Sequence, residues 1–245
     1  MYQIYVPTKS AEDWRRLLAD PKNHWKDCKS AKMTAERWEE CKASGLPDEI
    51  ALVFQSASAP GHLKGIVPIL ALPEYHVPLE GGTRDSQTDV FVLAKDADCG
   101  LVSIAVEGKY REDFGGTMAQ WRRDVSSNSG KPARIKQICG LLGLKLSVPE
   151  PMLSVPDAIR YQLLHRTASA IILAKRFNAR TAVMLVHSFS KKDNHFGDFG
   201  AFVRLFEDTA IVRVGELVHL TTTVDGIRVY AGWARGPECQ QAHGI

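Results

Sequence analysis

The chain has 245 residues, of which 44% are apolar and 24% are charged, a balance typical of proteins that fold around a core and not of disordered chains. Its formal net charge of +3 is too small to indicate a dedicated non-specific DNA-binding protein, which carries a denser array of Lys and Arg. No apolar run approaches the roughly 20 residues of a membrane-spanning helix, and the first residues lack the basic start of a signal peptide. We therefore expect a cytoplasmic protein with no membrane partner.

Five cysteines are spread along the chain: Cys28, Cys41, Cys99, Cys139 and Cys239. Their number is odd and no two of them form a Cys-x-x-Cys pair, so the usual spacing of a tetrahedral zinc site is absent. We therefore expect no disulfide framework, and a reducing compartment agrees with that expectation.

The N-terminal part is predicted to alternate short strands and helices. Residues 3–7 are predicted to form a strand, and Ser10 opens a capping box that starts a first helix. Thr34 is expected to cap a second helix. The apolar runs at 50–55 and 66–72 are predicted to be strands.

The middle of the chain contains the clearest pair of strands. A polar loop with glycines covers residues 80–88 and leads into a strand at 89–95. A second strand at 101–109 follows the loop 96–100. Residues 110–153 are then predicted to form an insertion that is mainly helical.

The C-terminal part begins with a long helix predicted over about 155–178. The continuous apolar run at 181–187 is typical of a strand buried on both faces. Asp225-Gly226 between two apolar runs is a strong signal for a two-residue hairpin. A β-rich extension is therefore expected over about 205–235.

Together these elements predict an α/β fold in a single domain over residues 1–245. Its core, about 34–188, would hold a mixed central sheet flanked by helices, and the β-rich C-terminal portion would pack on it. No internal repeat and no linker divides the chain.

The two central strands predict their own register. If they pair symmetrically about the loop 96–100, Asp89 lies opposite Glu107, and Lys109 shares their face because side chains alternate with a period of two. The opposite face would then be entirely apolar. It would carry Val90, Val92, Ala94, Val102, Ile104 and Val106.

Two carboxylates at opposed strand positions repel each other, so some cation must compensate them. Lys109 supplies one positive charge. A divalent ion supplies more, because carboxylate oxygens are ligands that Mg²⁺ prefers. The alternative is that Asp89 and Glu107 are strand-end residues that face water, with Lys109 as a surface partner.

Asp89, followed at the end of the next strand by Glu107-Gly108-Lys109, resembles the signature of the PD-(D/E)XK nuclease superfamily, which has the restriction-endonuclease-like fold. The residue before the acid is Thr88 and not Pro, at a position where many members vary. The core of this superfamily runs helix, three strands, helix, strand, and the predicted elements occur in that order. The resemblance implies a restriction-endonuclease-like mixed central sheet flanked by helices.

The resemblance also implies roles for these residues. Asp89, Glu107 and the carbonyl of Gly108 would bind Mg²⁺ or Mn²⁺, and Lys109 would orient water or stabilise charge on the phosphate. Gln162, on the long helix, would be a fourth catalytic residue. An acid from the first core helix would complete the site, with three candidates: Glu36, Glu39 and Glu40.

Further positions are candidates for contact with substrate. Arg84, Lys131 and Arg166 would bind phosphate groups. Gln162, His165 and Arg166 form a polar stripe on an otherwise apolar helix, and this stripe is either an exposed face or the wall of the site.

The resemblance implies a metal-dependent nuclease that hydrolyses phosphodiester bonds, with DNA favoured over RNA as the partner, and it allows a homodimer. Two alternatives stay open. One is a non-catalytic member of the same fold that binds nucleic acid or protein. The other is an unrelated α/β protein that binds a small molecule, which a deep apolar pocket away from Asp89 would favour.

Overall fold

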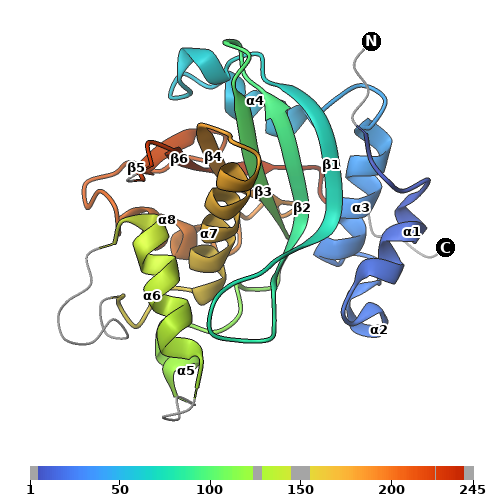
Figure 1. Ribbon diagram of the computed structural model, residues 1–245. Coiled ribbons are helices and arrows are strands. Elements are labelled where there is room, and N and C mark those ends of the chain that lie inside the picture. Colours follow the sequence, from blue (N-terminus) through green and yellow to red (C-terminus); the bar gives the residue numbers. More distant parts are fainter. Residues whose placement is uncertain (1–4, 124–128, 145–154, 224, 240–245) are drawn as a thin grey trace.

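The computed structural model of the protein describes residues 5–123, 129–144, 155–223 and 225–239. Within these ranges the chain forms a six-stranded mixed sheet with helices on both faces (Figure 1). The strand order is β1-β2-β3-β4-β6-β5. The expected α/β fold with a mixed central sheet and flanking helices is therefore confirmed.

The strands and helices have these bounds. The strands are β1 Val67–Val77, β2 Ser86–Lys95, β3 Leu101–Lys109, β4 Thr181–Ser188, β5 Leu217–Thr222 and β6 Arg228–Arg235. The helices are α1 Ala11–Trp14, α2 Pro21–His24, α3 Ser30–Cys41, α4 Asp48–Gln55, α5 Met118–Arg122, α6 Lys131–Leu142, α7 Tyr161–Arg176 and α8 Phe196–Val203, with short 3₁₀ turns at Arg15–Leu17 and Gly61–Leu63.

Strands β1, β2 and β3 form an antiparallel meander. In the β2–β3 pair, Lys95 faces Leu101 and Val90 faces Val106, so the register predicted from the symmetric loop is confirmed. Strand β2 begins at Ser86, earlier than predicted, because the residues before Asp89 still pair with β1.

Helix α7 connects β3 to β4, which lie side by side and parallel. It packs against strands β3 and β4 on one face of the sheet, and α6 packs on α7. Ser103 on β3 donates a 2.8 Å hydrogen bond to the carbonyl of Ala170 in α7, which ties the helix to the strand. Every residue of β4 is buried, as predicted for 181–187.

Helices α3 and α4 cover the opposite face of the sheet (Figure 1). There they enclose the apolar side of the hairpin, including Val92 and Ile104, together with Trp38 and Phe54. The predicted apolar face is thus core. The site described below lies on the other face.

Residues 50–55 were expected to form a strand, and this prediction is wrong because they lie in helix α4. Ile50, Val53 and Phe54 are fully buried, whereas Leu52 is 61% exposed. This is the three- and four-residue spacing of a helix. When every residue of a short run is apolar, the sequence does not reveal the period of a helix. Here the period is visible only from the exposure of Leu52 in the structure.

Two predicted helix starts are also wrong. Thr34 lies inside α3, buried, and not at its N-cap, which is Lys29. Helix α7 begins at Tyr161, not near residue 155, because Arg160 is extended and bridges to Thr117.

Cys28 and Cys239 form a disulfide, so the expectation of no disulfide framework is wrong for these two cysteines.

The predicted C-terminal extension is not a separate layer, because β6 pairs with β4 and joins the central sheet. The predicted helical insertion contains α5 and α6. Its residues 124–128 and 145–153, like residues 3 and 4 of the predicted first strand, lie outside the described residues. None of the described helices has the length and apolar character needed to cross a membrane.

Candidate active site

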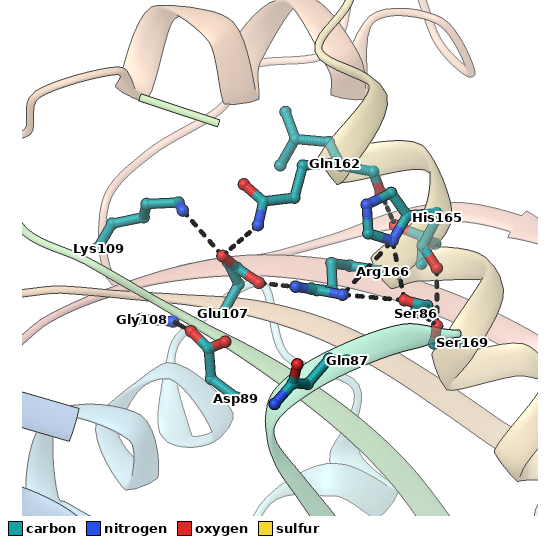
Figure 2. A network of polar contacts seen from close by, with 12 residues as sticks. Ser86, Gln87, Asp89, Glu107, Gly108, Lys109, Gln162, His165, Arg166 and Ser169 are labelled. Carbon is teal, nitrogen blue, oxygen red and sulfur yellow. Dashed lines mark hydrogen bonds and ion pairs between the residues drawn. The ribbon is translucent and has the colours of Figure 1, made fainter. Parts of the chain in front are cut away.

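A cavity of about 700 Å³ opens where β2 begins and β3 ends. Asp89, Glu107 and Lys109 all line it, so the structure brings the three predicted residues together on one face of the sheet (Figure 2). Helix α7 supplies another wall through Gln162 and Arg166. The polar stripe of this helix therefore faces the cavity and is not an outer surface.

Glu107 is the centre of a buried ion network and is only 2% exposed. Its Oε1 accepts hydrogen bonds from Lys109 Nζ at 2.8 Å and from Gln162 Nε2 at 2.6 Å. Its Oε2 accepts one from Arg166 Nε at 2.5 Å. Burial raises the pKa of Glu107, but Arg166 and Lys109 outweigh it and leave the pKa below 4.5. The carboxylate is therefore ionised at neutral pH.

Asp89 is the less compensated of the two predicted acids. Its Oδ2 accepts a 2.8 Å hydrogen bond from the Gly108 amide. Burial and the nearby charge of Glu107 raise the pKa of Asp89 from 3.8 to about 7, against the opposing effect of Arg166 and Lys109. This carboxyl group gains and loses its proton near neutral pH, and an added cation would favour its ionised form.

Lys109 is buried, with 5% of its surface exposed. Its ammonium group lies 5.1 Å from the centre of the Phe114 ring, a cation–π distance. Together with the ion pair to Glu107, this contact fixes the charge at the floor of the cavity.

Gly108 separates Glu107 from Lys109 and is packed closely against helix α3. A Cβ built on Gly108 would overlap Thr34 Oγ1, so the middle position of the Glu-Gly-Lys motif has no room for a side chain. The glycine lets α3 support the strand directly behind the site.

A second layer of polar residues supports the network. Ser86 Oγ lies 2.9 Å from Arg166 Nη1, 2.8 Å from His165 Nδ1 and 2.8 Å from Ser169 Oγ. Ser86 is 2% exposed. The start of β2 is thus joined to α7 by side chains that also position the guanidinium on Glu107 (Figure 2).

Glu74 on β1 is a third acid at this cavity, and the sequence interpretation missed it. It is 8% exposed, and its Oε2 accepts a 2.9 Å hydrogen bond from Gln87. Burial and the neighbouring charge of Asp89 raise the pKa of Glu74 well above 4.5. A signal was present, because Glu74 is the one acid in the apolar stretch from 66 to 79.

The acids proposed from the first core helix do not line the cavity. Glu36 pairs with Lys32 and Glu40 with Arg37, both on α3. Glu39 accepts hydrogen bonds from Trp14 and Lys42. Glu39 thus joins α3 to α1, whereas Glu36 and Glu40 form exposed ion pairs within α3, and none of the three lines the cavity.

Two of the proposed phosphate contacts also lie elsewhere. Arg84 is exposed, and its carbonyl accepts a hydrogen bond from Arg134. Lys131 donates a 2.7 Å hydrogen bond to the Trp121 carbonyl and lies over the Trp121 ring. Neither residue lines the cavity. Arg166 does, but its guanidinium is bound to Glu107.

The residues at the cavity include oxygen donors suited to a hard divalent cation, namely the carboxylates of Asp89 and Glu107. In the described part of the chain, no three His, Cys, Asp or Glu side chains are grouped as a metal centre. A cation at this pair would therefore take its remaining ligands from the main chain, water or substrate, as Mg²⁺ commonly does.

No curated protein matches the chain, and no solved structure matches it. A family model described as Domain of unknown function (DUF6946) matches residues 7–238, which is nearly the whole chain and includes every residue of the cavity. The protein therefore belongs to the DUF6946 family.

Proposed function

We propose that the protein is a divalent-metal-dependent phosphodiesterase of the nuclease type, with its site at Asp89, Glu107, Lys109 and Gln162. One observation carries the proposal. An ionised, buried Glu107 holds Lys109 and Gln162 at the floor of a cavity, beside Asp89 with a pKa of about 7. Strongly perturbed acids next to a fixed cation in a cavity are typical of catalytic sites.

The donor set fits Mg²⁺ or Mn²⁺. Asp89 and Glu107 would hold the ion, with the carbonyl of Gly108 as a further ligand, and the raised pKa of Asp89 indicates a carboxyl group with too little positive charge around it. When bound, the ion would supply a Lewis acid that polarises a phosphoryl oxygen. Both oxygens of Glu107 already accept hydrogen bonds, so binding would require Arg166 or Lys109 to give up part of its contact.

The chain's own residues have distinct roles in this proposal. Lys109 stabilises the negative charge that builds on the phosphate as water attacks it. Gln162 holds Glu107 in place and orients the carboxylate. Arg166 keeps Glu107 ionised, since its guanidinium is the largest influence that lowers the pKa of that acid.

The order of elements supports the same proposal. The resemblance to the PD-(D/E)XK superfamily requires a helix, three strands, a helix and a strand, and α3, β1, β2, β3, α7 and β4 occur in this order, with α4 inserted before β1 and α5 and α6 inserted before α7. The partner in this proposal is nucleic acid, with DNA favoured, and a homodimer is part of the same proposal. The proposed location is cytoplasmic, where the Cys28–Cys239 disulfide would be an exception to the usual reduced state of thiols. The cavity contains Asp89, which favours this function over a small-molecule site elsewhere in the chain.

One observation favours the second candidate, a non-catalytic nucleic-acid-binding protein of the same fold. Glu107 is fully satisfied by donors from the chain itself. A carboxylate held in this way can act as a purely structural ion pair.

A nicking assay separates the two candidates. Supercoiled plasmid and RNA are incubated with the protein in Mg²⁺, Mn²⁺ or EDTA, beside Glu107→Gln and Lys109→Ala. Lys95→Ala is the matched control, because Lys95 is an exposed lysine at the other end of the same hairpin. We expect cleavage with metal only, and a loss of about 100- to 1,000-fold in the two site variants, because Glu107→Gln weakens the hold on the metal ion and Lys109→Ala removes a cation that stabilises charge on the phosphate.

Two results would count against the proposal. Metal-dependent nicking that survives both site substitutions would place the active site elsewhere. Binding of nucleic acid without cleavage under any metal condition would establish the second candidate.

A further inference from the structure

His165 stands at the junction of α7 and β2, on the edge of the cavity. The helix spacing of three and four residues places Gln162, His165, Arg166 and Ser169 on one face. His165 is partly exposed and lines the cavity. Its Nδ1 contacts Ser86 in the network described above, but nothing described so far uses its Nε2.

The hydrogen bonds around His165 fix which ring nitrogen carries the proton. A guanidinium has only donors, and Arg166 Nη1 lies 2.9 Å from Ser86 Oγ and 3.4 Å from His165 Nδ1. Ser86 Oγ also accepts from Ser169 Oγ at 2.8 Å, so both of its lone pairs are used and the proton between Ser86 and Nδ1 is the one on Ser86. The Ser86 hydroxyl, which accepts from Arg166, donates its own proton to Nδ1 across 2.8 Å. The neutral ring therefore carries its proton on Nε2.

The surroundings keep this ring neutral and oriented. Burial, followed by the charges of Arg166, Arg134 and Lys109, lowers the pKa of His165 well below 6.5. The Tyr161 ring packs against the imidazole with 4.8 Å between ring centres. Among the described residues we find no hydrogen-bond partner for Nε2, and in Figure 2 this nitrogen is on the side turned toward Gln162.

We propose that His165 is a substrate-binding residue, whose Nε2–H donates a hydrogen bond to a backbone phosphate oxygen of nucleic acid in the cavity. This proposal rests on the proposed function and deepens it. Lys109, Gln162 and Arg166 each give a donor to Glu107, whereas the Nε2–H of His165 is not tied to that acid. A phosphate brings only acceptor oxygens, which is the chemistry that an unused N–H donor recognises.

The test measures binding without catalysis. A fluorescein-labelled single-stranded DNA oligonucleotide is titrated in EDTA with the wild-type protein, His165→Ala and His165→Gln. His76→Ala serves as the control because that histidine is exposed and does not line the cavity. The glutamine amide can place an N–H close to the position of Nε2. We expect His165→Ala to weaken binding about 10- to 100-fold, as loss of a hydrogen bond to a charged group does, and His165→Gln to recover most of it.

A second measurement reads the tautomer directly. A long-range ¹H–¹⁵N correlation spectrum of the histidine side chains, assigned by the signals that vanish in His165→Gln, should show the proton on Nε2 at pH 7. A proton on Nδ1, or a doubly protonated ring, would overturn the proposal. So would oligonucleotide binding that is unchanged in a folded His165→Ala variant, or no binding by the wild type.

The outcomes distinguish this inference from the proposed function. If the wild type cleaves and His165→Ala binds and cleaves equally well, the role of His165 is refuted while the nuclease remains. If the wild type binds through His165 but cleaves nothing, the phosphodiesterase is refuted while the binding role of His165 stands.

Discussion

His187 is the penultimate residue of β4 and has no exposed surface, and its Nε2 lies 2.7 Å from Glu49 Oε1. Glu49 also accepts hydrogen bonds from Arg37 at 2.8 and 3.0 Å. Burial raises the pKa of Glu49, but hydrogen bonds from His187 and Arg37 outweigh it and lower the pKa from 4.5 to about 2. Burial lowers the pKa of His187, against the pull of Glu49. Like Glu107, Glu49 is an acid that accepts hydrogen bonds from basic side chains of other elements.

These shifts predict a loss of stability toward acid pH. A histidine with a lowered pKa is neutral in the folded state, so below pH 6.5 the unfolded chain binds the proton more strongly and stability falls. Glu49 adds a further loss as the pH falls from about 4.5 toward its folded pKa of about 2. We expect His187→Gln, which keeps a donor toward Glu49 but does not titrate, to flatten the pH dependence between 7 and 5.

Urea unfolding at several pH values checks this. Below pH 6.5 the wild-type free energy of unfolding should fall more steeply than that of His187→Gln, with the difference in slope approaching about 1.4 kcal/mol per pH unit. Parallel curves for the two proteins would show that His187 is protonated equally in both states.

At the scale of elements, the contact between α3 and β3 holds the Glu107-Gly108-Lys109 segment in place. Gly108 on β3 meets Thr34 on α3, where Oγ1 is buried and has no hydrogen-bond partner among the described residues. Thr34 Cβ would lie 3.4 Å from a Cβ at Gly108. The hydroxyl is therefore the main obstacle to a side chain at this position.

Gly108→Ala should destabilise the protein by about 1–3 kcal/mol, the usual cost of overpacking a core. Adding Thr34→Ala to the Gly108→Ala variant should restore most of the lost stability, because it removes the oxygen that the new methyl group would overlap. Gly140→Ala is the control, since it is exposed on α6 with open space around it and should stabilise by up to about 1 kcal/mol. Denaturant unfolding is measured for the wild type, Gly108→Ala, the Gly108→Ala/Thr34→Ala double variant and Gly140→Ala. Equal stability of Gly108→Ala and the wild type would contradict the close packing.

For the whole molecule, the disulfide joins segments that are 211 residues apart. Cys28 lies between α2 and α3, and Cys239 follows β6. Both sulfur atoms pack beside Met33, Tyr110 and Phe189. The bond thus ties the end of the last strand to the loop that precedes α3, and Lys29 of that loop lines the cavity.

Removing this bond should lower the free energy of unfolding by about 2–5 kcal/mol, because it frees a very long loop in the unfolded chain. Cys28→Ser and Cys239→Ser should behave alike, and the exposed Cys99→Ser should match the wild type. Unfolding with and without reductant measures the effect. Peptide mapping that finds no Cys28–Cys239 link in the oxidised protein would contradict the pairing.

The sequence by itself determined the central hairpin and the motif it carries. Symmetric pairing about the loop 96–100 sets the register, and because side chains alternate with a period of two it places Asp89, Glu107 and Lys109 on one face, so a one-residue shift of either strand would separate the two acids. The same local information predicted β4 and the Asp225-Gly226 hairpin, because both signals lie within a few residues. It could not separate helix from strand at 50–55, where the apolar run is too short to show its period.

Only the tertiary structure decided what surrounds that hairpin. Glu74 reaches the cavity through the β1–β2 pairing, and Ser86 meets His165 across 79 residues of chain. Cys28 meets Cys239 across 211. Such contacts depend on how whole elements pack, and packing is set by the summed burial of many side chains, so no short window of the sequence contains them.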